Sequence, residues 1–385
     1  MHATATAWLA LETSGGALAV GLVLAARMLP NLLFGLAAGT LADRSHRNRL
    51  LVGVSLAGIP LMLALNRVAS QEHVAVWEVV GLAFATGCLN VLDVPARQAL
   101  VMDTVPRELA PNAMGLNALA ARLCTALGGF AAGLLIPSAG VAACYLVVAL
   151  ATTVSATLVL FARPAKRPTS HLGLQQRPSF GRALRQAGRL VLDVAAVRRL
   201  IVAGIACEIF GFSFQTAVPV FARDVLAAGP EGLGALNAAV SLGGAASVVT
   251  LSMLPARVPR EPLLGGVFVL YGVALVALAL THDLPLAAAV LCLTGAAAAA
   301  FDLLQQTLMQ LAVPEEQRGR AVGVWVLGIG SAPLGHLEMG TLAAAVGAPL
   351  ALGINGGLVL LAASTLLARA GGWRGGLARP ARRAG

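Results

Sequence analysis

Eleven long apolar stretches constrain the fold of this chain more than any other feature of its sequence. A helix needs about 20 apolar residues to cross a bilayer, and each stretch reaches or nearly reaches this length. Glycines and prolines recur inside them, which membrane helices tolerate better than soluble helices do. The stretches therefore predict an all-α membrane protein with spans at Ala17–Ala38, Leu50–Leu65, Val74–Val94, Ala113–Ile136, Ala139–Phe161, Leu200–Phe221, Leu233–Leu254, Leu263–Leu280, Leu284–Leu308, Ala321–Ala345 and Pro349–Ala368.

The composition supports a membrane protein and excludes several soluble classes. Only 11% of the 385 residues are charged, 58% are apolar, and the mean hydropathy is +0.83. A soluble domain carries about 25% charged residues, so this chain could not cover a water-exposed surface. We therefore exclude a soluble enzyme, a disordered chain and a nucleic-acid-binding module, and we expect the lipid bilayer to surround the protein.

The basic residues predict the orientation of the chain in the membrane. The net charge is +10, and short cytoplasmic loops of membrane proteins collect positive charge. Basic residues gather in the 44–49 loop, in the 163–199 segment and in the tail from Arg369, whereas the opposite loops hold only Arg67 and Arg223. We expect a multi-pass protein of the bacterial inner (plasma) membrane with a cytoplasmic C-terminus and no nucleic-acid partner.

Two similar halves flank the polar centre of the chain. VPRELAPNAMG (105–115) matches VPEEQRGRAVG (313–323) 208 positions later, and further glycines match at nearly the same offset. The polar segment between the halves carries apolar residues at helical spacing among arginines, which predicts a basic amphipathic helix on the cytoplasmic face. We expect four regions: an N-terminal bundle at 1–162, a linker at 163–199, a C-terminal bundle at 200–369 and a basic tail at 370–385.

The start of the chain predicts an incomplete first helix. Residues 1–15 hold only a short apolar run before Glu12, which is too short to span and lacks the basic leader of a signal peptide. The repeat places the start of a complete first helix about 14 residues before Met1. We expect two pseudo-symmetric six-helix bundles, with eleven full transmembrane helices plus a remnant of the first. Either a start-site error or a real truncation explains the remnant.

The loop after the second predicted helix resembles the signature loop of the major facilitator superfamily. It reads GTLADRSHRNRL at 39–50, with one glycine of the signature replaced. The resemblance implies that Gly39, Asp43, Arg44 and Arg47 form a cytoplasmic gate. A carboxylate is stabilised near a helix N-terminus, and it can form and break a pair with arginine. The alternative is that the arginines only anchor this loop in the cytoplasm.

Further stretches resemble the macrolide- and siderophore-exporting branch of that superfamily. They are DVPARQALVMDTVP (93–106), NALAARLCTALGGFAAG (117–133), VPVFARDVL (218–226) and VPEEQRGRAVG (313–323). The resemblance implies a secondary active transporter that exports a bulky amphipathic small molecule, such as a drug, macrolide, siderophore or secondary metabolite. It also implies alternating access between the two halves, driven by a proton or another ion. The fourth helix departs from the main drug/proton antiporters because it lacks their arginine motif.

Three ionisable residues lie near the centres of predicted helices. They are Arg27, Arg122 and Glu208, and each is a functional candidate because a charge inside a span is costly. We predict that they line the central cavity, with Glu208 as the proton or cation site and one of the arginines as its counter-charge. The alternative is a structural ion pair that joins the halves.

Five other polar residues are candidates for a second gate or a proton relay. Asp93 and Asp302 lie near the cytoplasmic ends of the fourth and tenth helices at nearly matching repeat positions, and Arg97 follows the first of them. For Asp93 and Asp302, contacts with the substrate are the alternative to a gate. His336 and Glu338 lie in the eleventh helix, where a histidine that titrates near neutral pH suits a relay. For these two, a satisfied structural pair is the alternative.

Other functional classes have little support in the sequence. The HExxH, GxSxG and GxxxxGK[ST] motifs are missing, and the five cysteines are scattered without metal-ligand spacing. We therefore expect no enzyme, no cofactor and no metal, and we expect a monomer that binds a small-molecule substrate. Two alternatives to an exporter stay open. One is an importer of the same fold, and the other is a non-transporting, truncated membrane protein such as a sensor or a decayed gene product.

Overall fold

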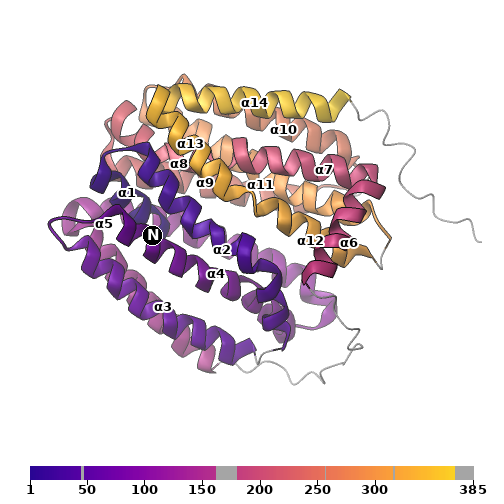
Figure 1. The fold of residues 1–385 in the computed structure, drawn as a ribbon, viewed down its shortest axis with the longest axis horizontal. Coiled ribbons are helices and arrows are strands. Elements are labelled where there is room, and N and C mark those ends of the chain that lie inside the picture. The colour runs from indigo at the N-terminus through magenta and orange to yellow at the C-terminus, as the bar shows by residue number, and fades with distance from the viewer. Residues whose placement is uncertain (45–46, 162–179, 256, 315–316, 369–385) are drawn as a thin grey trace, which may run out of the picture.

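The apolar stretches form helices, and the described part of the chain contains no strand (Figure 1). The computed structural model describes residues 1–44, 47–161, 180–255, 257–314 and 317–368. In Figure 1 the first half of the chain, from indigo to purple, lies along one side of the bundle. The second half, from pink to yellow, lies along the other.

The first half consists of five helices and one short turn. Each helix except the first is longer than 20 residues, as a bilayer-crossing helix requires. The elements are α1 (His2–Ser14), α2 (Ala17–Arg44), α3 (Arg47–Ala69), α4 (Val76–Thr104), a 3₁₀ turn η1 (Arg107–Leu109) and α5 (Ala110–Phe161).

The second half begins with a helix in the polar centre of the chain, α6 (Phe180–Asp193). A continuous helical segment follows, in which two π-helical turns interrupt the regular α-helix. Its parts are α7 (Ala195–Ala206), η2 (Cys207–Gly211), α8 (Phe214–Val220) and η3 (Phe221–Val225). The remaining helices are α9 (Gly229–Ser252), α10 (Arg260–Ala279), α11 (Leu284–Leu311), α12 (Arg318–Ile329), α13 (Ala332–Val346) and α14 (Ala348–Ala368).

Nine helical segments among the described residues are long and apolar enough to cross a membrane, against the eleven stretches in the sequence. The difference arises at two places. Helix α5 runs through two of the predicted spans, and Gly140, with φ 79° and ψ 165°, kinks the chain between them. The predicted span at 321–345 is divided into α12 and α13 near Gly330, so that neither part reaches the required length.

Large apolar side chains cover the outside of this bundle. Trp77, Leu150, Leu158 and Phe161 are between 65% and 77% exposed. A water-soluble protein rarely exposes a wide apolar surface, whereas lipid chains solvate one readily. The exposed surface therefore has the character of a lipid-facing wall.

The turns define two ends of the bundle. The end that we call the Gly15 end, on the left of Figure 1, holds the α1–α2 turn. It also holds the other glycines with positive φ, which are Gly140, Gly229 and Gly347. Successive long helices run back and forth, so the α4–α5 and α9–α10 turns lie at the opposite end. We call this second end the Arg97 end.

The two halves meet most closely near the Gly15 end. Helix α5 packs along α9, and α2 packs along α13. A Cβ atom on Gly133 would lie 2.9 Å from the Cα atom of Gly234, and one on Gly21 would lie 3.0 Å from the Cα atom of Gly340. Because small residues let membrane helices approach closely, these glycine pairs join the halves backbone to backbone.

We predict that Gly133→Ala lowers the melting temperature of the purified protein in detergent. The new methyl group has no space against Gly234, and overpacking costs about 1–3 kcal/mol. The matched control is Gly266→Ala in α10, where a Cβ atom meets no other atom within 4 Å. Equal melting temperatures for both variants and the wild type would contradict the contact.

Candidate functional site

Charged side chains from both halves line one small cavity. Arg122 comes from α5 in the first half, and Asp302 comes from α11 in the second half. The cavity has a volume of about 100 Å³, and Phe212, Phe214 and Gln215 complete part of its wall. The site thus places a cation and a carboxylate on opposite sides of the boundary between the halves.

Arg122 reaches this cavity across helix α9. A Cβ atom on Gly244 would clash with the Arg122 guanidinium, so the glycine makes room for it. Within the described residues neither Arg122 nor Asp302 forms an ion pair shorter than 4.0 Å. The Arg122 charge still acts on the Asp302 carboxylate, whose charged form the Trp325 side chain also stabilises. Opposite charges therefore face each other across the cavity without direct contact.

Glu208 lies near Asp302, on the π-helical turn η2. Turns of this kind occur frequently at functional sites. The Glu208 carboxylate is close enough for its charge to act on Asp302 and on Tyr271. Tyr271 is fully buried, and its hydroxyl has no hydrogen-bond partner among the described residues. Among the described residues, neither the Arg27 nor the Arg122 guanidinium forms an ion pair with the Glu208 carboxylate within 4.0 Å.

Arg27 lies in α2 beside a different and larger cavity. This cavity has a volume of about 700 Å³ between α2, α3, α4 and α5, and His2, Asn90 and Asp93 also line it. The Arg27 Nε atom is buried and has no hydrogen-bond partner in the described ranges. The structure therefore places Arg27 inside the first half, apart from the cavity that Arg122 shares with Asp302.

Asp93 and Arg97 form an ion pair within α4. The Arg97 Nη2 atom lies 2.9 Å from Asp93 Oδ1, and Nε donates a second hydrogen bond of 3.1 Å to Oδ2. The Asp93 side chain is 21% exposed and the Arg97 side chain is 48% exposed. The pair joins successive turns of one helix, so it does not cross between the halves.

His336 and Glu338 of α13 belong to two separate hydrogen-bond networks. The His336 Nδ1 atom lies 2.9 Å from the Thr216 hydroxyl oxygen of α8. The Glu338 carboxylate accepts a hydrogen bond of 2.9 Å from Asn355 of α14, which also donates one of 3.2 Å to Ser213. The two predicted relay residues thus face different helices of the second half.

Several residues of the site carry no charge, and the sequence analysis missed them. Tyr271, Trp325, Thr216, Ser213 and Asn355 lie in apolar stretches, where a polar side chain needs a partner. A polar residue within an apolar stretch is the feature of the sequence that could have identified them. Across the described residues, no three His, Cys, Asp or Glu side chains gather closely enough to hold a metal ion.

The structure describes most of the backbone of the predicted gate loop but not the side chains of its predicted gate residues. The backbone of Gly39, Asp43 and Arg44 forms the last turns of α2, and Arg47 begins α3. The side chains of these four residues lie outside the described part, as do residues 162–179 of the linker and the tail from 369 to 385.

A bundle of long apolar helices in two halves, with charges between them, is the architecture of the major facilitator class of membrane transporters. The sequence pattern of one family of this class, described as transmembrane secretion effector, matches residues 1–371. The chain belongs to this family. Transporters of this class are not enzymes.

Two relatives in sequence are named as an exporter and a transporter of particular compounds. The chain is 29% identical over 373 residues to the enterobactin exporter EntS of Shigella boydii serotype 18, covering 94% of this chain and 84% of that protein. It is 22% identical to the staphyloferrin A transporter of Staphylococcus aureus, covering 86% and 82% of the two chains. The similarity thus extends over most of each protein.

Solved structures support the same fold at lower identity. The xylose transporter XylE from E. coli has a TM-score of 0.72 and 13% identity, and the match covers 95% of this chain and 92% of that one. A bacterial homologue of the human lysosomal transporter Spinster has a TM-score of 0.66 and 14% identity, with 99% and 97% covered. These two comparisons bear on the fold alone.

We predict that Arg122 and Asp302 are energetically coupled. Arg122→Met removes the charge that faces the Asp302 carboxylate and should destabilise the protein, whereas Asp302→Asn added to it should recover part of the loss. A double-mutant cycle from thermal unfolding in detergent should give about 1 kcal/mol of coupling. The control cycle combines Arg122→Met with Asp93→Asn, which lies beside the other cavity. Additive effects in both cycles would contradict the coupling.

Proposed function

We propose that this protein is a secondary active exporter of a siderophore or a similarly bulky amphipathic small molecule. The family match supports transport, and two relatives are named for enterobactin and staphyloferrin A. The observation that carries the proposal is the group of Arg122, Asp302 and Glu208, which draws on both halves. Charges are costly inside a bilayer and are found there where a protein uses them.

A proton gradient drives this export through Glu208. Arg122 faces Asp302 across the cavity, and the Glu208 carboxylate lies near enough for its charge to repel that of Asp302. When Glu208 takes up a proton, this repulsion ends, and the negative charge of Asp302 is stabilised opposite Arg122. Release of the proton restores the repulsion between the two carboxylates. The protonation state of Glu208 therefore biases how tightly the two halves hold each other at the cavity.

The positive charges favour a substrate with an anionic group. Arg122 and Arg27 each lie beside a cavity. In the described part of the chain, neither guanidinium has a carboxylate oxygen within 4.0 Å. An anionic group that binds Arg122 competes with the carboxylates of the second half. Substrate binding and proton binding thereby act on the same interaction between the halves.

The chain crosses the membrane eleven times in this proposal, and the short helix α1 precedes these crossings. The kink at Gly140 separates two spans within α5, and α12 and α13 together form one more. The halves are 1–162 and 200–369, and the monomer is the transporting unit. The distribution of arginines supports an outward-facing Gly15 end in the bacterial inner membrane, with the Arg97 end, the linker and the tail at 370–385 in the cytoplasm.

Two groups of predicted residues serve as gate and support in this scheme. Gly39, Asp43, Arg44 and Arg47 lie where α2 ends and α3 begins, at the Arg97 end, and we assign them to the cytoplasmic gate. The Asp93–Arg97 pair lies near the same end and is exposed enough to exchange partners as that end closes. His336 and Glu338 hydrogen bond within the second half, so we assign them to holding α13 against α8 and α14.

We predict that Glu208→Gln abolishes energised export while the protein still reaches the membrane in normal amounts. Glutamine keeps the shape of the side chain but cannot carry the proton. The measurement is accumulation of a catecholate siderophore, a macrolide and a dye in a pump-deficient bacterium, with and without a protonophore. Membrane expression is checked by immunoblot. The matched control is Glu231→Gln, an exposed acid at the start of α9.

The outcomes of this experiment separate the functional classes. The wild type should lower accumulation of at least one compound, and the protonophore should cancel the effect. Full export by Glu208→Gln would remove Glu208 from the mechanism. Raised accumulation in cells with the wild type would indicate an importer. No change for any compound, despite membrane expression, would contradict the exporter and favour a non-transporting protein.

A further inference from the structure

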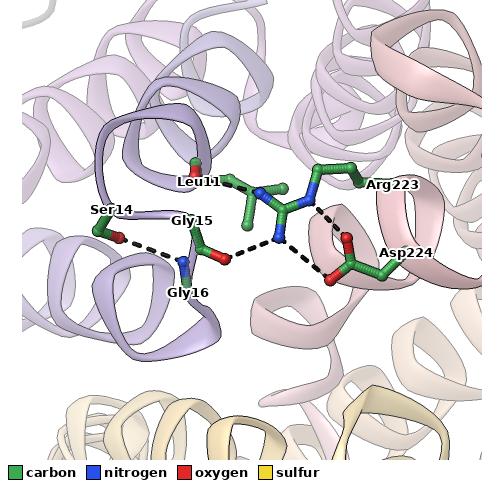
Figure 2. Close-up of polar contacts among 6 residues, drawn as sticks. All are labelled: Leu11, Ser14, Gly15, Gly16, Arg223 and Asp224. Carbon is green, nitrogen blue, oxygen red and sulfur yellow. Dashed lines mark hydrogen bonds and ion pairs between the residues drawn. The ribbon is translucent and has the colours of Figure 1, made fainter.

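Arg223 is one of only two basic residues in the loops opposite the arginine-rich side of the chain. Membrane proteins keep positive charge away from the outer side, so an arginine retained there needs a local reason. The structure places Arg223 in η3 of the second half, directly beside the α1–α2 turn of the first half (Figure 2).

The Arg223 guanidinium bridges the two halves. Its Nη2 atom donates a hydrogen bond of 2.7 Å to the Gly15 carbonyl oxygen, and Nη1 donates a longer one of 3.4 Å to the Leu11 carbonyl oxygen. On its own side, Nε and Nη2 donate to the two carboxylate oxygens of Asp224 at 2.5 and 3.1 Å. Figure 2 shows the guanidinium between the carboxylate and the end of α1.

The end of α1 is a suitable acceptor for a cation. The helix ends at Ser14, and Gly15 adopts a left-handed conformation with φ 67°, which turns the chain toward α2. The carbonyls at the C-terminus of a helix carry a partial negative charge, and the Leu11 carbonyl accepts the Arg223 bond in addition to one from the Gly15 N–H. Arg223 therefore caps α1 from the other half of the molecule, and Asp224 holds the guanidinium in the required orientation.

We propose that Arg223 is a latch that holds the Gly15 end of the transporter closed. Its contacts join the same two halves as the Gly133–Gly234 pair and the hydrogen bond of 3.3 Å from Asn237 to Thr4. When the halves separate at this end, the bonds from Arg223 to α1 break, while the pair with Asp224 moves with the second half. The proposal rests on alternating access, which belongs to the proposed function above.

The test measures the separation of the halves at the Gly15 end. Spin labels at Gln71→Cys and His282→Cys report this separation by pulsed electron paramagnetic resonance, in full-length protein whose five native cysteines are replaced by alanine. Both positions are exposed, in the α3–α4 turn of the first half and the α10–α11 turn of the second. The protein is studied in proteoliposomes without substrate.

Arg223→Gln should raise the ratio of long to short label distances about five- to tenfold, because two bonds from a charged donor are lost. Arg223→Lys should give a smaller rise, since an ammonium group cannot contact α1 and Asp224 with the same fork of donors. The matched control is Arg67→Gln, the other arginine of this side, which should leave the distances unchanged. Size-exclusion profiles identify any variant that fails to fold.

An unchanged distance distribution in folded Arg223→Gln would overturn the latch, as would an equal change in Arg67→Gln. This readout needs no substrate, so it is independent of the cargo. A distance shift with no transport by any variant would support the latch and count against the exporter. Normal export with unchanged distances would overturn the latch and leave the exporter standing.

Discussion

The structure depends on the close contact of two helical halves along small residues. Inside a bilayer, burying apolar side chains gives no advantage over lipid, so packing shape decides which helices associate. Gly133 against Gly234 and Gly21 against Gly340 allow the backbones to meet. This contact sets the boundary on which Arg122 and Asp302 face each other.

The polar interactions between the two halves differ between the Gly15 end and the small cavity. Near the Gly15 end, Arg223 donates directional hydrogen bonds to main-chain carbonyls of the other half. At the small cavity, Arg122 faces Asp302 without touching it, and Glu208 stands beside them. Direct hydrogen bonds such as those of Arg223 suit the stabilisation of one conformation. The separated charges of Arg122 and Asp302 suit a site at which a proton or an anion binds and leaves.

Much of the fold could be predicted from apolar length alone. The stretch Leu284–Leu308 became α11 (Leu284–Leu311), because both its start and its composition were unambiguous. The kink at Gly140 and the interruption near Gly330 could not be predicted, since both depend on local backbone geometry within continuous apolar sequence.

The site was predicted less completely. Charges within spans identified Arg122, Glu208 and Asp302 as candidates, but the sequence does not give the rotation of one helix against its neighbours. Arg122 therefore faces Asp302, whereas Glu208 was the expected partner. Arg27 lies beside another cavity for the same reason. Tyr271 and Asn355 were missed because uncharged polar residues are common in membrane helices and only their surroundings make them informative.

The most direct measurement is flux through the purified protein in proteoliposomes with an imposed pH gradient. A catecholate siderophore on one side of the membrane should move against its concentration gradient while protons move down theirs. The flux should reverse with the sign of the pH gradient and stop when an ionophore collapses it. A flux that does not depend on the gradient would contradict proton-driven export, and no flux of any tested compound would contradict transport itself.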